Sequence, residues 1–297
     1  MNKGIYYASF TAFLWGFMAI ALKIALKEVS PVTVTWIRFV VAFVSLFLFY
    51  AITDFRKINI ITKPPKTAII AAIFLIFNYI GFIAGIKHTS PSIGQIFIQM
   101  APALFALSGV VIFKEKITKK QIFGFLIVLV GLSVFYHEQI VNIAGGLKQY
   151  KIGVWLVLFA AFSWAMYAIF QKLAVQKTNP MQLNLIIFGI PSVALIPFVD
   201  FSQLFSLSLN YWLLMVFLGL NTLAAYGSLS YAFKYLEANK ISVIITLNPL
   251  ITLVVMAILS KNNVTWIQNE QFTLLTVVGA LTVLSGVILT VTGRKKT

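Results

Sequence analysis

Polar side chains interrupt the long apolar stretches of this chain, and their types decide which chemistry it could perform. Most are amides and tyrosine hydroxyls, and the candidates to line a ligand cavity are Asn78, Tyr79, Gln95, Gln99, Asn221, Tyr226 and Asn248. Such residues are costly in an apolar setting, which makes each a functional hypothesis. Uncharged donors and acceptors suit a zwitterionic or uncharged polar ligand. Hydrogen bonding between helices is the alternative for each of them.

Three aromatic residues join this set by their position in apolar segments. Trp15 and Trp164 lie near the middle of theirs, whereas membrane tryptophans usually gather at the interfaces. Tyr167 shares the helical face of Trp164. We interpret the three as cavity wall or gate, with core packing as the alternative.

Arg38 and two prolines stand out for other reasons. Arg38 lies about two turns inside its apolar segment, where it could bind backbone carbonyls or an anionic group of a ligand. Pro102 and Pro249 each remove one intrahelical hydrogen bond, so we interpret them as hinges or as static bends.

The groups that enzymes need are not gathered in this sequence. There is no cysteine, and the only histidines, His88 and His137, lack metal-ligand spacing. Every acidic residue falls in or near a predicted turn, so a carboxylate relay for protons is not supported. The sequence therefore predicts no catalytic residues, no metal and no cofactor, and a protein that is not an enzyme.

The elements that carry these residues are membrane-spanning helices. Of the 297 residues 60% are hydrophobic and 10% are charged, in blocks long enough to cross a bilayer as helices. We expect an all-α integral membrane protein whose ten spans lie at 4–26, 32–52, 67–86, 91–113, 118–136, 152–173, 181–199, 211–233, 239–260 and 272–292.

Basic residues orient these spans. The net charge of +16 is spread in short groups between apolar blocks, which is typical of topology signals and does not indicate nucleic-acid binding. One face receives only Lys27, Lys87, Lys148, Lys151 and Lys261. The positive-inside rule then places both termini of this multi-pass protein in the cytoplasm.

The two halves of the chain match each other in order. Trp15 corresponds to Trp164, Tyr79 to Tyr226, Pro102 to Pro249, Ser30-Pro31 to Asn179-Pro180, and Gly124 and Gly131 to Gly279 and Gly286. Two repeats of five spans each, 1–144 and 145–297, enter the membrane in opposite directions because five is odd. Inverted repeats are typical of transporters that work by alternating access, with a site near the midplane.

The chain resembles the EamA-like branch of the drug/metabolite transporter superfamily. The resemblance covers nearly the whole chain and rests on the matched residues above, on Arg38 and on Lys114-Glu115-Lys116. It departs at Lys261-Asn262-Asn263, where an acidic residue matching Glu115 would be usual. The resemblance implies a transporter in the cytoplasmic (inner) membrane, acting as monomer or homodimer on a small-molecule substrate.

The substrate class stays open between two readings. Amino acids or related small polar metabolites fit the amides and hydroxyls. A nucleotide-like or S-adenosylmethionine-type metabolite would use Arg38 and stacking on Trp15 or Trp164. A channel is a further alternative, although no ring of selectivity groups marks one.

Overall fold

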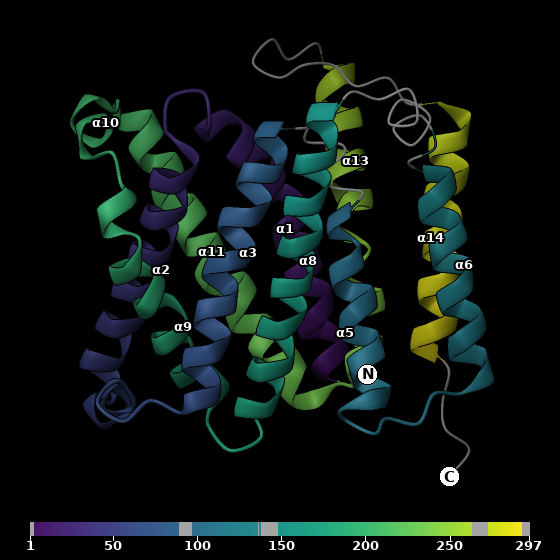
Figure 1. The fold of residues 1–297 in the computed structure, drawn as a ribbon, viewed down its shortest axis with the longest axis horizontal. Helices are drawn as coiled ribbons and strands as arrows, with labels where there is room; N and C mark the ends of the chain where they lie inside the picture. Colours follow the sequence, from purple (N-terminus) through teal and green to yellow (C-terminus); the bar gives the residue numbers. More distant parts are fainter. Residues whose placement is uncertain (1–2, 89–96, 136, 138–147, 263–272, 293–297) are drawn as a thin grey trace. The chain divides into compact units, whose positions relative to one another are not determined.

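The computed structural model describes residues 3–88, 97–135, 137, 148–262 and 273–292, and all regular structure in these ranges is helical (Figure 1). Six of the described helices are long and apolar enough to cross a membrane: α1 (Lys3–Ala25), α2 (Pro31–Thr53), α3 (Lys66–His88), α8 (Lys148–Ala174), α11 (Leu209–Tyr235) and α14 (Leu274–Thr292). The shorter helices are α5 (Met100–Val111), α6 (Lys119–Phe135), α9 (Pro180–Ala194), α10 (Phe201–Ser206), α12 (Ala238–Ile245), α13 (Asn248–Lys261) and the 3-10 helices η1 (Phe55–Ile61) and η2 (Ile196–Phe198). The protein is thus an all-α membrane protein.

Two of the matched sequence pairs have the same local role. Ser30 is the N-cap of α2 and its hydroxyl accepts a hydrogen bond from the Thr33 backbone N–H, while Pro31 is the first helical residue. Asn179 caps α9 in the same way ahead of Pro180. A polar cap followed by proline is a strong helix start, because the missing proline N–H would have no partner there anyway.

The structure divides some of the predicted spans. The predicted span 239–260 consists of α12 and α13, separated by a turn at Thr246 and Leu247. Pro249 therefore lies in the first turn of α13 and not within a continuous helix. Pro102 similarly lies in the first turn of α5, after a turn at Gln99. A proline is tolerated in a first turn because no helical partner awaits its N–H.

One further boundary differs from prediction. The seventh predicted span, 181–199, ends as an α-helix at Ala194 and continues as η2. The beginning of the fourth, 91–96, lies outside the described residues, as do Gln95 and most of the connection after α13.

The chain packs as two compact units, each drawn from both halves of the sequence. The first unit comprises Met1–Ile80 and Met166–Tyr235, and the second comprises Gly81–Ala165 and Leu236–Thr297. In the first unit α11 packs against α1, α2 and α9. One of its apolar clusters joins Ala25 of α1, Ile37 of α2 and Leu218 of α11.

In the second unit α6 and α14 lie side by side (Figure 1). Their contact is made by the matched glycines Gly124, Gly131, Gly279 and Gly286. A Cβ atom on Gly279 would lie 2.4 Å from the backbone nitrogen of Phe135, so only glycine permits this approach. Small residues at helix contacts are typical of membrane proteins. Elsewhere in this unit α12 packs against α5 and α14.

Candidate functional site

Arg38 is the central residue of a polar cluster in the first unit. It projects from α2 and is only 2% exposed. Its Nε donates to Thr222 Oγ1 of α11 at 3.1 Å, and its Nη2 donates to Tyr79 Oη of α3 at 3.1 Å. Nη2 also lies 2.8 Å from Met18 Sδ of α1. Four helices therefore hold one guanidinium in place.

The Tyr79 ring lies against the same guanidinium and leads into a cluster of aromatic rings. Tyr79 Oη lies 3.3 Å from Tyr226 Oη, and Arg38 Cζ lies 5.2 Å from the centroid of the Tyr79 ring. Tyr226 in turn makes edge contacts with Trp15 and Tyr167, with ring centroids 5.5 and 5.8 Å away. The structure thus brings together five of the predicted site residues. Aromatic faces attract cations, and tyrosine hydroxyls both donate and accept hydrogen bonds.

The charge on Arg38 is not balanced by a carboxylate of the described residues. Its hydrogen-bond partners there are a hydroxyl, a phenol and a thioether, all neutral. The acidic side chains that the structure describes lie at helix ends or in connections: Glu28, Asp54, Glu115, Asp200 and Glu237. Arginine stays protonated even when buried. Guanidinium N–H groups have the geometry and charge to bind a carboxylate or a phosphate.

Asn221 adds an open acceptor to this unit. It is 5% exposed and its Nδ2 donates to the Leu14 carbonyl at 3.2 Å. Its Oδ1 is buried and has no hydrogen-bond donor among the described residues. Asn78, the neighbour of Tyr79 on α3, is also buried at 7% exposed. An amide oxygen in this state can accept from an N–H group of a ligand.

A second polar network in the first unit links α8, α9 and α11. Gln171 Nε2 donates to Ser230 Oγ at 2.9 Å and to Asn184 Oδ1 at 3.3 Å, and Ser230 Oγ lies 3.0 Å from Asn184 Oδ1. All three side chains are fully buried. Such a network fixes the mutual placement of three helices beside the aromatic cluster.

The remaining predicted site residues lie in the second unit, apart from Gln95, which lies outside the described residues. Trp164 contacts the Phe105 ring with centroids 6.2 Å apart. Gln99 precedes α5, and Asn248 begins α13, where its carbonyl accepts from Thr252 Oγ1. That Trp164, Gln99 and Asn248 contact the same ligand as Arg38 stays a prediction.

Sequence reasoning missed several residues that hold the Arg38 cluster together. Met18 and Thr222 contact Arg38, and Asn184 and Ser230 complete the amide network. One available signal was the four-residue spacing of Thr222, Tyr226 and Ser230, which places three polar side chains on one face of α11. No pattern in the sequence marks Met18, because a thioether reads as ordinary apolar core.

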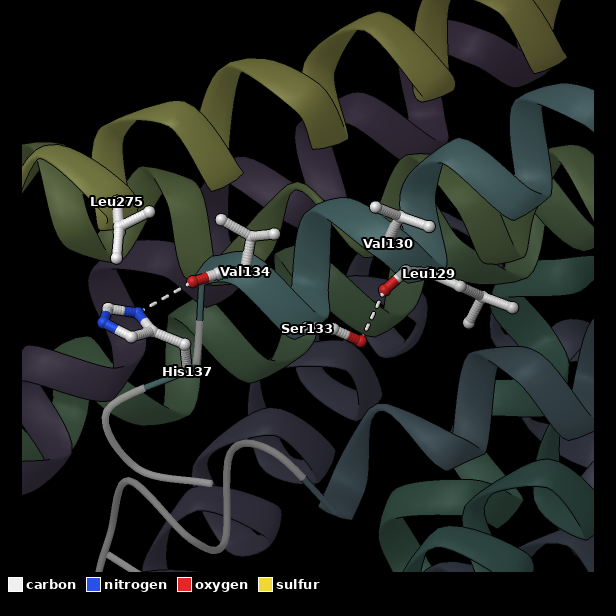
Figure 2. Close-up of a pocket in the computed structure, with 6 residues that line it drawn as sticks. All are labelled: Leu129, Val130, Ser133, Val134, His137 and Leu275. Carbon is white, nitrogen blue, oxygen red and sulfur yellow. Dashed lines mark hydrogen bonds between the residues drawn. The ribbon is translucent and has the colours of Figure 1, made fainter. Parts of the chain in front are cut away.

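An open groove on the surface of the second unit has a different character. Figure 2 shows the side chains that line it: Leu129, Val130, Ser133, Val134, His137 and Leu275. Ser133 Oγ donates to the Leu129 carbonyl at 3.0 Å, and His137 Nδ1 lies 3.0 Å from the Val134 carbonyl. Its polar side chains thus bond to their own helix, as serine does in membrane helices. We interpret this groove as lipid-facing.

Comparison with known proteins identifies the family. The profile of the EamA-like transporter family matches residues 2–136 and again residues 151–292. This chain belongs to the EamA-like transporter family. An uncharacterized transporter of Haemophilus influenzae is 33% identical over 98% of this chain and 95% of its own length. The uncharacterized inner membrane transporter YhbE of Escherichia coli K12 is 31% identical over 98% of this chain and 92% of its own.

One solved structure and one more distant relative are also similar to this chain. A crystal structure with no functional description shares 15% identity and a TM-score of 0.77, covering 98% of both chains, which supports the fold alone. A Salmonella typhimurium protein described as a probable amino-acid metabolite efflux pump is 26% identical over 67% of this chain and 62% of its own. The EamA-like chain is thus a multi-pass membrane protein, and the relatives named above are described as transporters.

Proposed function

We propose that this EamA-like protein is a secondary transporter of small polar metabolites that carry a carboxylate, amino acids or close relatives of them. The supporting observation is the buried guanidinium of Arg38, which has neutral partners only among the described residues. Burying an unpaired charge is expensive, and a substrate carboxylate would offset that cost. Arg38 is then the anion contact of the site.

The rest of the cluster suits a zwitterion. Rings such as Tyr226 and Trp15 attract an ammonium group by their π-electrons, and Asn221 Oδ1 offers an unused acceptor among the described residues. Tyr79 and Tyr167 complete the aromatic wall. The name of the Salmonella relative supports the same substrate class. Asn78, Gln95, Gln99, Trp164 and Asn248 are further contacts in this proposal, with Pro102 and Pro249 as hinges.

Transport would proceed by alternating access. Ten spans arranged as inverted repeats, 1–144 and 145–297, would exchange inward and outward openings, with both termini in the cytoplasm. The separate matches of the family profile to residues 2–136 and 151–292 support two repeats. Each packing unit combines helices from both repeats.

Uptake into proteoliposomes tests this proposal. The panel holds individually radiolabelled L-amino acids and the amines formed by removing their carboxylates, each with and without a proton gradient. We expect saturable uptake of at least one amino acid and little uptake of its amine. Linear flux, or equal uptake of acid and amine, would refute a site built on Arg38.

Arg38→Met supplies the matched variant, with Arg56→Met as control. Methionine fills a similar volume, so folding should survive, because an apolar replacement of a buried charge is often neutral or stabilising. Apparent affinity for the substrate should fall about 30-fold or more, because loss of one partner of a buried charge pair costs about 2–5 kcal/mol of binding free energy. Arg56 is exposed in η1, so its substitution should leave affinity unchanged.

A further inference from the structure

Asn239 is a buried amide on the first turn of α12, in the second unit. It is 2% exposed, and neither its Nδ2 nor its Oδ1 has a hydrogen-bond partner among the described residues. Two unused polar atoms on one buried side chain are unusual, because nearly all such groups in proteins are bonded. Each one costs free energy unless a ligand or water meets it.

The face of α12 that carries Asn239 is polar over two turns. Ser242 follows one turn later on the same side of the helix, and Thr246, seven residues after Asn239, lies in the turn that ends α12. Both hydroxyls are buried and donate to carbonyls of their own helix, of Ala238 at 2.9 Å and of Val243 at 2.6 Å. Their lone pairs therefore stay available as acceptors.

Glu115 fixes the turn from which Asn239 projects. Its Oε1 accepts from the Ala238 backbone N–H at 2.7 Å, and its Oε2 accepts from the Asn239 N–H at 3.4 Å. A helix is normally capped by its own N-cap residue. Here the N-cap residue, Glu237, makes no side-chain capping bond and instead pairs with Lys240 at 3.1 Å. The cap comes from the α5–α6 connection.

This contact leaves no room for a larger residue beneath it. A Cβ atom on Gly109 of α5 would lie 2.7 Å from Glu115 Oε2 and 3.3 Å from the Ala238 Cβ. The α5 helix, the Glu115 carboxylate and the α12 N-terminus are therefore in direct contact. The amide of Asn239 is thus held on a well-defined turn, as a binding group should be.

We propose that Asn239 is a further substrate contact, contributed by α12 of the second unit. A primary amide offers two donors and two acceptor lone pairs, which match the carboxylate and ammonium of a zwitterionic head group. The assignment rests on the proposed transport of amino-acid-like substrates. Glu115 is a positioning residue, which acts through the turn that presents Asn239.

Asn239→Leu tests the contact with two readouts, thermal stability and the KM of uptake. Leucine removes the two unused polar atoms, so the midpoint of thermal unfolding should stay equal or rise. The KM for the transported amino acid should rise about tenfold or more, as expected when hydrogen bonds to charged groups are lost. A lower midpoint, or an unchanged KM, would overturn the proposal and leave Asn239 as a structural or water-bound amide.

Gln121→Leu is the control, because Gln121 is also a buried amide of the second unit. Its Oε1 accepts from the Thr118 backbone N–H at 2.9 Å, so its loss should lower the unfolding midpoint and leave KM unchanged. The two proposals fail separately: an effect of Arg38→Met without one of Asn239→Leu sinks only the second contact. Saturable uptake of no amino acid in the panel would refute both.

Thiol labelling tests the role of Glu115, because the chain has no cysteine of its own. Ser242→Cys places a thiol on the buried polar face of α12. Glu115→Ala should speed its labelling about fivefold or more, the effect expected for loss of a helix cap, and should raise KM. Glu115→Gln keeps one accepting oxygen and should restore most of both values, whereas Glu237→Gln should change neither. Equal labelling in Glu115→Ala and the parent would exclude the positioning role.

Discussion

The contact between α6 and α14 predicts that Gly279→Ala destabilises the protein, whereas Gly227→Ala in α11 does not. In Gly279→Ala the new Cβ would lie 2.4 Å from Phe135 N, 2.6 Å from Phe135 Cα and 2.9 Å from the Gly131 carbonyl oxygen. All three atoms are backbone, so the side chains cannot relieve the overlap. The helices would have to separate by about 1 Å to reach ordinary contact, which forfeits a quarter to half of the dispersion energy of the atoms that part.

The magnitude follows from two opposing terms. Overpacking by one methyl group costs about 1–3 kcal/mol, and rigid backbone neighbours favour the upper part of that range. Alanine regains about 0.8–1 kcal/mol of helix propensity over glycine. We therefore expect a net loss of about 1–2 kcal/mol, which lowers the ratio of folded to unfolded protein about 5- to 30-fold.

Gly227→Ala is the matched control, since it regains the same helix propensity. Its new Cβ would meet only Met181 Sδ and Cε, at 3.2 and 3.3 Å, the far end of a flexible side chain. We expect this variant to be as stable as the parent or more so. Thermal unfolding in detergent, followed by the fluorescence of the six tryptophans, measures both. Equal stability of the two variants would refute the reading of α6–α14 as a backbone-to-backbone contact.

Three further predictions follow from contacts in the first unit. Thr222→Val removes the acceptor of Arg38 Nε and should weaken substrate affinity about tenfold, the lower end of what a hydrogen bond to a charged group contributes; unchanged affinity in a binding titration would contradict a guanidinium held by Thr222. Ser230→Ala takes away a partner of both Gln171 and Asn184 and should destabilise the fold by about 1 kcal/mol or more in a thermal unfolding assay, whereas an unchanged midpoint would mean the network is not closed. Hydrogen bonding to Ser202 lowers the pKa of Asp200, the N-cap of α10, from its ordinary 3.8. The ionised Asp200 cap therefore stabilises α10 fully above pH 3.8, and this stabilisation is lost as pH falls through the lower pKa of the folded state. Amide exchange at the start of α10, corrected for its intrinsic pH dependence, should rise only in that acidic window.

Local rules predicted the parts of the fold that depend on neighbours in sequence. Apolar length located the long helices, and the caps at Ser30 and Asn179 were visible as polar residues before proline. The matched glycines of α6 and α14 also proved to share one contact. Helix breaks were harder to place: Pro249 suggested a kink, whereas the chain makes a turn at Thr246 and Leu247 and begins a new helix.

Partners across helices could not be predicted, because they depend on how the faces of four helices are rotated. The position of Arg38 inside an apolar segment was enough to show that burying its charge costs free energy. That its guanidinium would meet Thr222, Met18 and Tyr79 required knowledge of which residues of α11, α1 and α3 face α2. The same holds for Asn239, which looked like an ordinary residue at the start of a span until its two polar atoms were found buried without partners among the described residues.

The sequence by itself determined that this chain is a helical membrane protein of the EamA-like transporter family and which of its polar residues are expensive. Apolar length, charge and matched motifs are one-dimensional properties, and they survive without knowledge of packing. Only the tertiary structure decided which of these polar atoms find hydrogen-bond partners within the protein. Gln171, Asn184 and Ser230 bond to one another, although Gln171 Oε1 has no partner among the described residues, and Asn221 and Asn239 also keep unused atoms there. The physical reason is that a hydrogen bond joins two specific atoms at about 3 Å, and only the packed helices set that distance.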